Sequence, residues 1–251
     1  MNNHYSHDNR THVYQRRRLA AWLCLATSLL LLGGTLLYSF QTGILPGFAG
    51  TSGQLVLPGL GRVLGGNSSC STPNHPSGDS TLSLNSGGLL RTFIVHLPPS
   101  YGQEPQPVVF NYHGYDNTAA RMVKYTNMGV EADRENFIVV FPQGADDGLG
   151  KASWNAGIGP TGTTGSADDV QFTRDMISYL QKNYCIDMHR IYVTGYSIGA
   201  SMAYRVACTL SNQIAALATV EGAFYHFDGG CQPTRPIPVL EIHGQADQFA
   251  P

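Results

Sequence analysis

The sequence predicts an α/β fold in which a mainly parallel sheet carries helices on both faces. Short runs of branched and aromatic residues recur between residues 91 and 242, and most of them lack the polar alternation of a half-exposed strand. Segments with helical spacing separate several of these runs, as expected when helices connect parallel strands. Ligands of such sheets bind where the strands end, so the residues that directly follow a strand are the first candidates for function.

The predicted strands are bounded by glycine, proline or polar residues, which favour turns. They cover residues 91–97, 108–112, 137–141, 190–194, 214–220 and 237–242. A long Gly-rich stretch, residues 142–167, follows the third strand, and loops of this length in compact domains are commonly functional. Trp154 within this stretch favours an ordered loop.

Helical patterns separate the strands. Residues 118–136 predict two short helices, because Asn127 and Gly129 interrupt the pattern. A longer helix opens at Asp168 and Asp169, whose carboxylates favour the positive end of the helix dipole, and this structural role explains both acids without catalysis. The buried side of that helix consists of Phe172, Met176, Leu180 and Tyr184. The helix after residue 197 has an equivalent stripe of Ile198, Met202, Val206 and Leu210.

The N-terminal part divides into three segments ahead of a folded domain. Residues 1–18 form a basic tail ending in three arginines, and residues 19–40 contain no charged residue over a length that crosses a bilayer as one helix. We expect a signal anchor with a cytoplasmic tail, and a cleaved signal peptide is the alternative. The stretch 41–80, rich in Gly, Ser and Pro, is the predicted stalk, and residues 81–251 are the predicted folded domain.

Either form of the N-terminal segment sends the chain into the secretory pathway, anchored as a type II membrane protein or secreted, and the cysteines agree with that compartment. Four cysteines lie outside the apolar segment and allow three pairings. We favour Cys208 with Cys231, because the first should end a helix and the second precede a strand, which leaves Cys70 with Cys185. Asn67 begins an Asn-Ser-Ser glycosylation sequon.

The composition argues against several classes of partner. A formal net charge of −2 and a pI near 6.5 give no electrostatic basis for binding nucleic acid. The sequence has no C-x-x-C or H-E-x-x-H spacing, so we expect neither a metal site nor a cofactor.

The strongest chemical signal is Gly-Tyr-Ser-Ile-Gly, residues 195–199, between a predicted strand and a predicted helix. Its two glycines allow a sharp turn that leaves Ser197 exposed and strained, as a nucleophile requires. The amide of Ile198 then begins the helix and is placed to stabilise an oxyanion. Asp247 lies 50 residues after the serine, directly beyond the last predicted strand, and is the candidate acid that orients a catalytic histidine.

Six motifs occur in order between residue 90 and residue 251. They are Arg91–Pro98, His113-Gly114, Ser153–Gly157, Asp168–Val170, Gly195–Gly199 and Ile242–Asp247. Together they resemble the secreted serine esterases of the α/β-hydrolase fold, a family that includes feruloyl esterases, acetylxylan esterases and polyhydroxybutyrate depolymerases.

The resemblance implies a complete set of roles at one edge of the sheet. Ser197 would be the nucleophile and Asp247 the triad acid. The oxyanion hole would be formed by the amide of Ile198 together with the turn of Gly114 and Tyr115.

Trp154 and His113 are expected beside the substrate. His113 and His243 each precede a glycine in a tight turn, so we interpret them as shaping the strand ends, since the triad histidine of this fold follows the acid. Only four residues follow Asp247, and none is histidine. The expectation is therefore a truncated hydrolase that lacks the last helix, the last strand and the histidine loop, and that is nearly inactive by itself.

The predicted function is hydrolysis of carboxylic esters on plant cell-wall polysaccharide, most similar to feruloyl esterases, through an acyl-enzyme on Ser197. Two alternatives remain. The same machinery would serve a depolymerase of hydroxyalkanoate polyesters, and a chain without a base would also suit a non-catalytic, membrane-tethered binding protein.

Overall fold

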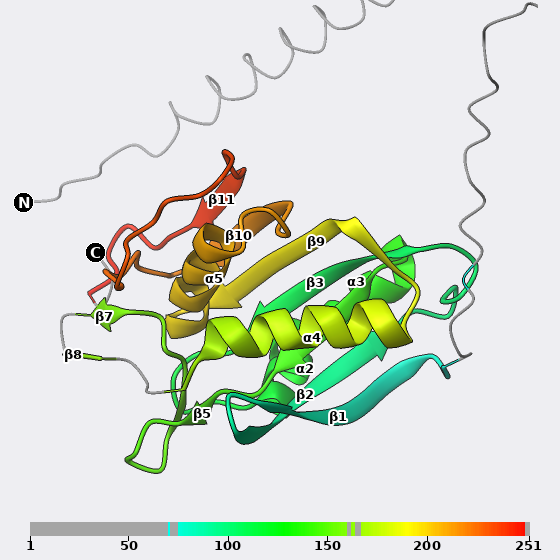
Figure 1. Ribbon diagram of the computed structural model, residues 1–251, viewed down its shortest axis with the longest axis horizontal. Coiled ribbons are helices and arrows are strands. Elements are labelled where there is room, and N and C mark those ends of the chain that lie inside the picture. Colours follow the sequence, from blue (N-terminus) through cyan, green and yellow to red (C-terminus); the bar gives the residue numbers. More distant parts are fainter. Residues whose placement is uncertain (1–69, 71–74, 160–161, 164–166, 249–251) are drawn as a thin grey trace, which may run out of the picture. The chain divides into compact units, whose positions relative to one another are not determined.

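The fold is built around one seven-stranded sheet with the strand order β1-β2-β4-β3-β9-β10-β11 (Figure 1). The computed structural model describes residues 70, 75–159, 162–163 and 167–248. All pairs from β4 to β11 are parallel, whereas β1 and β2 are antiparallel additions at one edge. The strands are β1 (Gly78–Ser86), β2 (Leu89–Leu97), β3 (Gln106–Tyr112), β4 (Ile138–Pro142), β9 (Ile186–Tyr196), β10 (Ala216–Val220) and β11 (Val239–Ile242).

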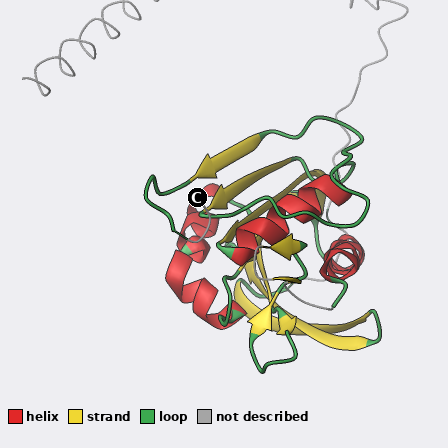
Figure 2. Cartoon of the chain, turned by 90° about the vertical axis from the view of Figure 1, so that its left-hand side faces the viewer, coloured by secondary structure: helices red, strands yellow, loops and turns green. Residues whose placement is uncertain are grey.

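Helices lie on both sides of this sheet, as Figure 2 shows, and each side has its own core. The larger cluster gathers α4 (Asp169–Asn183) and α5 (Ile198–Thr209), and the smaller gathers α2 (Ala119–Thr126) and α3 (Met128–Glu135). Strand β4 contributes to both clusters because its alternate side chains point to opposite faces. Every residue of β4 is buried, which confirms the prediction of a strand buried on both faces.

The predicted helices are confirmed in position and type. α2 and α3 are separated at Asn127, which adopts a left-handed conformation with φ 51°, whereas Gly129 lies inside α3. The side chain of Asp168 caps α4 by accepting a hydrogen bond from the amide of Gln171, as its predicted helix-start role requires. The long stretch after β4 is ordered in part by two small hairpins, β5–β6 (Ala145–Asp146, Ala152–Ser153) and β7–β8 (Ile158–Gly159, Gly162–Thr163).

The folded region begins earlier than the sequence predicts. Strand β1 starts at Gly78, inside the predicted stalk, and pairs along its whole length with β2 through a turn at Gly87-Gly88. Its Ser- and Thr-rich sequence alternates between half-buried and exposed residues, so the weak apolar signal is typical of a strand covered on one face only. Earlier still, His75 stacks on Tyr184 with ring centroids 4.2 Å apart.

The predicted membrane segment 19–40 and the sequon at Asn67 lie outside the described residues. Within the part of the chain that the structure describes, no helix has the length and apolar character needed to cross a membrane.

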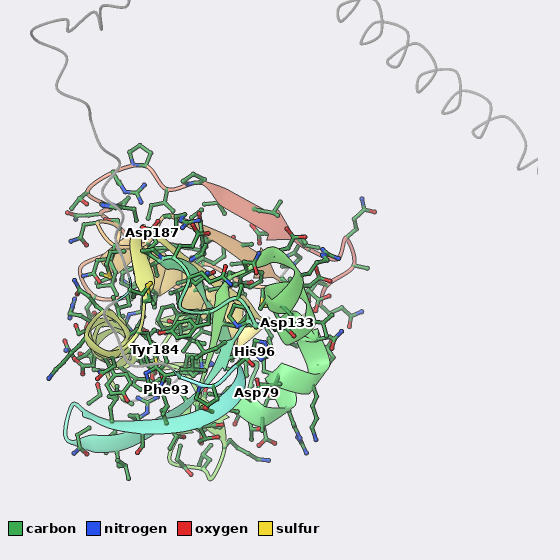
Figure 3. All side chains as sticks on the ribbon, turned by 90° about the vertical axis from the view of Figure 1, so that its right-hand side faces the viewer. Asp79, Phe93, His96, Asp133, Tyr184 and Asp187 are labelled. Carbon is green, nitrogen blue, oxygen red and sulfur yellow. A yellow bond between two sulfur atoms is a disulfide. The ribbon has the colours of Figure 1, made fainter. Side chains whose placement is uncertain are left out.

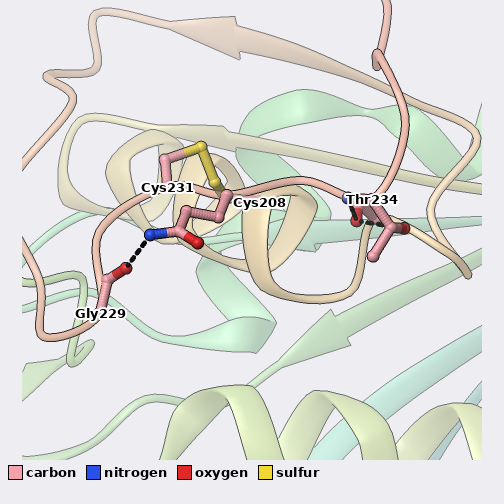
Figure 4. The surroundings of a disulfide bond; sticks show 6 residues. Cys208, Gly229, Cys231 and Thr234 are labelled. Carbon is pink, nitrogen blue, oxygen red and sulfur yellow. Dashed lines mark hydrogen bonds between the residues drawn. A yellow bond between two sulfur atoms is a disulfide. The ribbon is translucent and has the colours of Figure 1, made fainter.

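Both predicted disulfides are confirmed. Cys208, at the end of α5, is bonded to Cys231 in the loop that leads to β11, and their Cα atoms are 5.4 Å apart (Figure 4). Cys70 is bonded to Cys185 with the same Cα separation of 5.4 Å, which ties the segment ahead of β1 to the start of β9. The Cys231 loop is held further by a hydrogen bond from the amide of Thr234 to a serine hydroxyl after α5.

His96 on β2 links the edge of the sheet to a helix (Figure 3). Its Nδ1 lies 2.6 Å from a carboxylate oxygen of Asp79 on β1, and its Nε2 lies 3.1 Å from one of Asp133 on α3. Carboxylates accept hydrogen bonds, and only the imidazolium form of histidine donates from both ring nitrogens. His96 therefore joins β1, β2 and α3 through its contacts with two carboxylates.

Replacing His96 by alanine is expected to lower the free energy of unfolding by about 1 kcal/mol, because both carboxylates are half-exposed and each pair is partly screened. Urea unfolding at pH 5.5 measures this difference. Leu90→Ala, at an exposed position of the same β1–β2 hairpin, is the matched control and should leave stability unchanged. A His96→Ala variant as stable as the parent would show that the two contacts contribute nothing.

Candidate active site

The turn between β9 and α5 has the geometry of a nucleophile elbow. Ser197 connects the two elements with φ 55° and ψ −125°, a combination that residues with side chains rarely adopt. Such a conformation costs on the order of 1–3 kcal/mol and persists only where surrounding contacts enforce it. The amide of Ser197 donates to the carbonyl of Val220 at 3.0 Å, which fixes the elbow to the end of β10.

The two glycines of the motif are required by close backbone contacts. A Cβ atom on Gly199 would overlap the carbonyl groups of Tyr112 and His113, and one on Gly195 would overlap the backbone of Gly199. Helix α5 can therefore begin directly against the end of β3 only because both positions lack a side chain. This confirms the predicted sharp turn and explains the spacing of its glycines.

Ser197 does not have the capping role that is usual for a serine at the start of a helix. Its side chain makes no capping hydrogen bond, although its residue occupies the N-cap position of α5. The amide of Ile198 opens the helix, where first-turn N–H groups have no acceptor within the helix and the dipole favours negative charge. The position that a Cβ of Gly114 would occupy lies 3.6 Å from the Cβ of Ser197, so the turn after β3 adjoins the elbow.

The turn after β3 is held by hydrogen bonds to its carbonyl groups. Trp154 donates from Nε1 to the carbonyl of His113 at 2.7 Å, and Nδ1 of His113 donates to the carbonyl of Gly114 at the same distance. In a trans peptide the N–H points opposite to the C=O. The amides of Gly114 and Tyr115 are thus turned away from the buried Trp154 and His113 side chains, as donors to an oxyanion must be.

His113 and Trp154 support the site from inside the protein, which corrects the expectation that they contact substrate. Both side chains are fully buried, at 0% exposure. Nε2 of His113 accepts a hydrogen bond from the amide of Gly144 at 2.9 Å, so the ring is the neutral Nδ1–H tautomer. Burial lowers the pKa of His113. The neutral ring therefore contributes its full stabilisation of the folded protein at pH values above the ordinary histidine pKa. This contribution is lost when acid protonates the ring.

A buried ion pair holds the loop that carries Trp154. Arg91 on β2 donates to Asp169 at 2.7 Å, and the second carboxylate oxygen of Asp169 accepts from the amide of Asn155 at 2.6 Å. Arg91 also lies over the ring of Phe172, 4.2 Å from its centroid. Burial raises the pKa of Asp169, and the Arg91 guanidinium opposes that rise. Asp169 therefore does more than start a helix, since it fixes the loop residue next to Trp154.

Asp247 lies at the same edge of the sheet, in the turn that follows β11. Its amide donates to the carbonyl of Gly244 at 3.1 Å, and its carboxylate lies 3.2 Å from Nε2 of His243. His243 also approaches Glu241 through Nδ1 at 3.3 Å, so both of its ring nitrogens face carboxylates, and its role in shaping the strand end stays a prediction. The position of Asp247 beyond the second strand from the elbow fits that of a triad acid.

The sequence interpretation missed Glu221 and Tyr196. Glu221 follows β10 with φ 52°, and its amide donates to the carbonyl of Ile242 at 2.9 Å. Burial, followed by the negative charge of the nearby Glu221, raises the pKa of Tyr196. The signal was available, because an acid directly after a parallel strand lies at the ligand-binding edge.

Within the described residues, no group of three or more His, Cys, Asp or Glu side chains could hold a metal ion. The chemistry that the arrangement supports by itself is attack by a serine hydroxyl on a carbonyl whose developing oxyanion is bound by backbone amides.

Comparisons with known proteins agree with this geometry. Residues 91–229 match the family model described as Esterase PHB depolymerase. The chain is 37% identical over 161 residues to feruloyl esterase B of Piromyces equi, covering 62% of this chain and 29% of that protein. It is 30% identical over 160 residues to the bifunctional acetylxylan esterase/xylanase XynS20E of Neocallimastix patriciarum, covering 64% of this chain and 22% of that protein.

The alignments thus span well under half the length of these two relatives. Among solved structures, a crystal structure of native pOPH superimposes with a TM-score of 0.53 at 18% identity, over 70% of this chain and 72% of that one. This likeness concerns the fold, which is the α/β-hydrolase fold. Because the family model matches more than half of the sequence and its span includes the elbow, the chain belongs to the Esterase PHB depolymerase family.

Proposed function

We propose that this chain carries the nucleophile, the oxyanion hole and the triad acid of a serine carboxylic ester hydrolase. The elbow is the observation that supports this most strongly, since Ser197 is held at φ 55° beside Ile198 and Gly114. In the proposed reaction the hydroxyl oxygen of Ser197 attacks the ester carbonyl, the alcohol leaves with a proton, and water then releases the acid from the acyl-enzyme. Asp247 would orient the base.

The proposed substrates are carboxylic esters on plant cell-wall polysaccharide, with feruloyl esters first. Two relatives support this choice, since they are named feruloyl esterase B and acetylxylan esterase/xylanase. A hydroxyalkanoate polyester is the second candidate, because the family model is described as a PHB depolymerase. A secretory location, with residues 19–40 as anchor or signal, is part of the proposal and is supported by the two disulfides.

Hydrolysis of methyl ferulate and of a hydroxybutyrate trimer tests the choice between these substrates. Both are assayed with imidazole present to supply a base, and the rate of the Ser197→Ala variant is subtracted from each. The proposal expects the larger Ser197-dependent rate with methyl ferulate. A larger rate with the trimer would favour the polyester, and equal rates for parent and Ser197→Ala on both esters would refute the esterase assignment.

A further inference from the structure

Tyr115 lies in the oxyanion turn, Tyr196 adjoins the turn, and Tyr125 adjoins Tyr196. The hydroxyl of Tyr115 donates to Asp147 at 2.9 Å, and the ring of Tyr196 packs against the smaller core cluster. Both rings are therefore held by contacts outside the Ser197 elbow. Tyrosines that serve only to fill a core are buried, whereas Tyr115 is 52% exposed.

The ring of Tyr196 lies directly beside the groups that would bind the carbonyl of an ester. Tyr196 precedes Ser197 in the chain, and its Cδ1 is only 3.1 Å from the place where a Cβ of Gly114 would stand. A side chain at position 114 would therefore displace the ring. The oxyanion turn and the Tyr196 ring therefore lie on the same side of the site and form one wall of it. The acyl group of an ester held at Ser197 must extend either along this wall or away from it.

Tyr125 extends this wall to the surface. It lies in the last turn of α2, with its ring centroid 5.9 Å from that of Tyr196 and the two planes inclined by 46°. Its side chain is 70% exposed, whereas the side chain of Met122 on the same helix is buried. An exposed ring next to an oriented one provides aromatic surface that the fold itself does not use.

Negatively charged groups lie near the Tyr196 end of this aromatic surface. The charges of Glu221 and Asp247 act on Tyr196, and Asp147 accepts a hydrogen bond from Tyr115 in the oxyanion turn. A neutral aromatic ester can approach such an edge, whereas an anionic acid is repelled. The same arrangement would therefore admit an ester and favour departure of the acid released from it.

We propose that Tyr125 and Tyr196 form an acyl-binding platform that selects esters of planar aromatic acids over aliphatic esters. Offset or tilted aromatic contacts contribute stabilisation beyond the burial of area, and a saturated ring of similar size cannot make them. The inference rests on the proposed function, because it concerns the acyl side of the Ser197 site. It assigns to Tyr125 and Tyr196 a role in specificity and not in bond making.

Binding of methyl ferulate to the 251-residue Ser197→Ala protein tests the platform without any turnover. Dissociation constants are measured by NMR titration and compared with those of methyl 3-cyclohexylpropanoate, which has a saturated ring. Adding Tyr125→Ala is expected to weaken methyl ferulate binding about three- to ten-fold and to affect the saturated ester much less. Tyr125→Phe keeps the ring and should bind like the parent, and Leu90→Ala is the remote surface control.

The outcomes separate this inference from the proposed function. Unchanged affinity in Tyr125→Ala, equal losses for both esters, or no binding of methyl ferulate would overturn the platform. Acylation of Ser197 by an activated ester tests the nucleophile independently. If acylation failed while methyl ferulate binding depended on the Tyr125 ring, the platform would stand and the esterase assignment would fall. Thermal melts confirm that each variant folds, which an exposed position allows.

Discussion

Without added base, the 251-residue protein is expected to hydrolyse p-nitrophenyl acetate no faster than its Ser197→Ala variant, and imidazole is expected to raise only the parent's rate. A serine hydroxyl needs a base to accept its proton, and the ring nitrogens of His113 and His243, which follow β3 and β11, are engaged with other groups. Loss of the triad base in serine hydrolases costs on the order of a million-fold in rate. The remaining catalysis would come from the oxyanion hole and binding alone.

Imidazole also cleaves activated esters in solution, so the informative quantity is the difference between parent and Ser197→Ala at each imidazole concentration. We expect this difference to increase with the imidazole concentration. Turnover of the parent at ordinary enzyme rates, about 1 s⁻¹ or more, without imidazole would contradict it. A histidine already present would then act as the base, and His243→Gln would test the one that lies 3.2 Å from Asp247.

Replacing Asp169 by alanine is expected to lower the free energy of unfolding by about 3–5 kcal/mol. The change leaves the Arg91 guanidinium almost fully buried, at 5% side-chain exposure, without its 2.7 Å partner. It also removes the acceptor of the Asn155 amide, so the loop that positions Trp154 loses an anchor. Urea unfolding followed by tryptophan fluorescence measures both effects, because Trp154 is buried beside the oxyanion turn.

A double variant separates the ion pair from the packing around it. Arg91→Met with Asp169→Leu removes both charges and keeps apolar volume, so it should be less destabilised than Asp169→Ala alone. The Asn155 amide still lacks its acceptor in the double variant, and some loss should remain. A single variant within 1 kcal/mol of the parent would show that Arg91 finds another partner or reaches water.

The parallel part of the sheet could be predicted because the residues of each strand identify it as a strand without information from distant parts of the sequence. Residues 137–141 are apolar throughout, and the observed β4 is buried at every position. The elbow is equally local, since the sharp turn needs only the two glycines beside Ser197. Strand β1 escaped prediction because one of its faces is exposed and its register is set by pairing with β2, which no short window contains.

The support of the candidate site could not be predicted for the same reason. Arg91 and Asp169 are 78 residues apart, and Trp154 reaches the carbonyl of His113 across 41 residues. Both contacts arise only when β2, β3 and α4 are assembled. The local sequence is enough to explain Asp168, which caps a helix. Its neighbour Asp169 makes a contact with residues distant in the sequence, and the local pattern gives no sign of that contact.

The central claim is that Ser197 is the nucleophile, and the mass of the protein after reaction with p-nitrophenyl acetate tests it most directly. Imidazole is present during the reaction to accept the serine proton, and it is then removed together with the excess ester by rapid desalting. Water also needs a base to attack the acyl-enzyme, so an acyl group placed on Ser197 should then persist long enough for peptide mapping. We predict one acyl group per protein, located on Ser197 and missing in Ser197→Ala. Acylation confined to lysines, or equal in the parent and the variant, would contradict the claim.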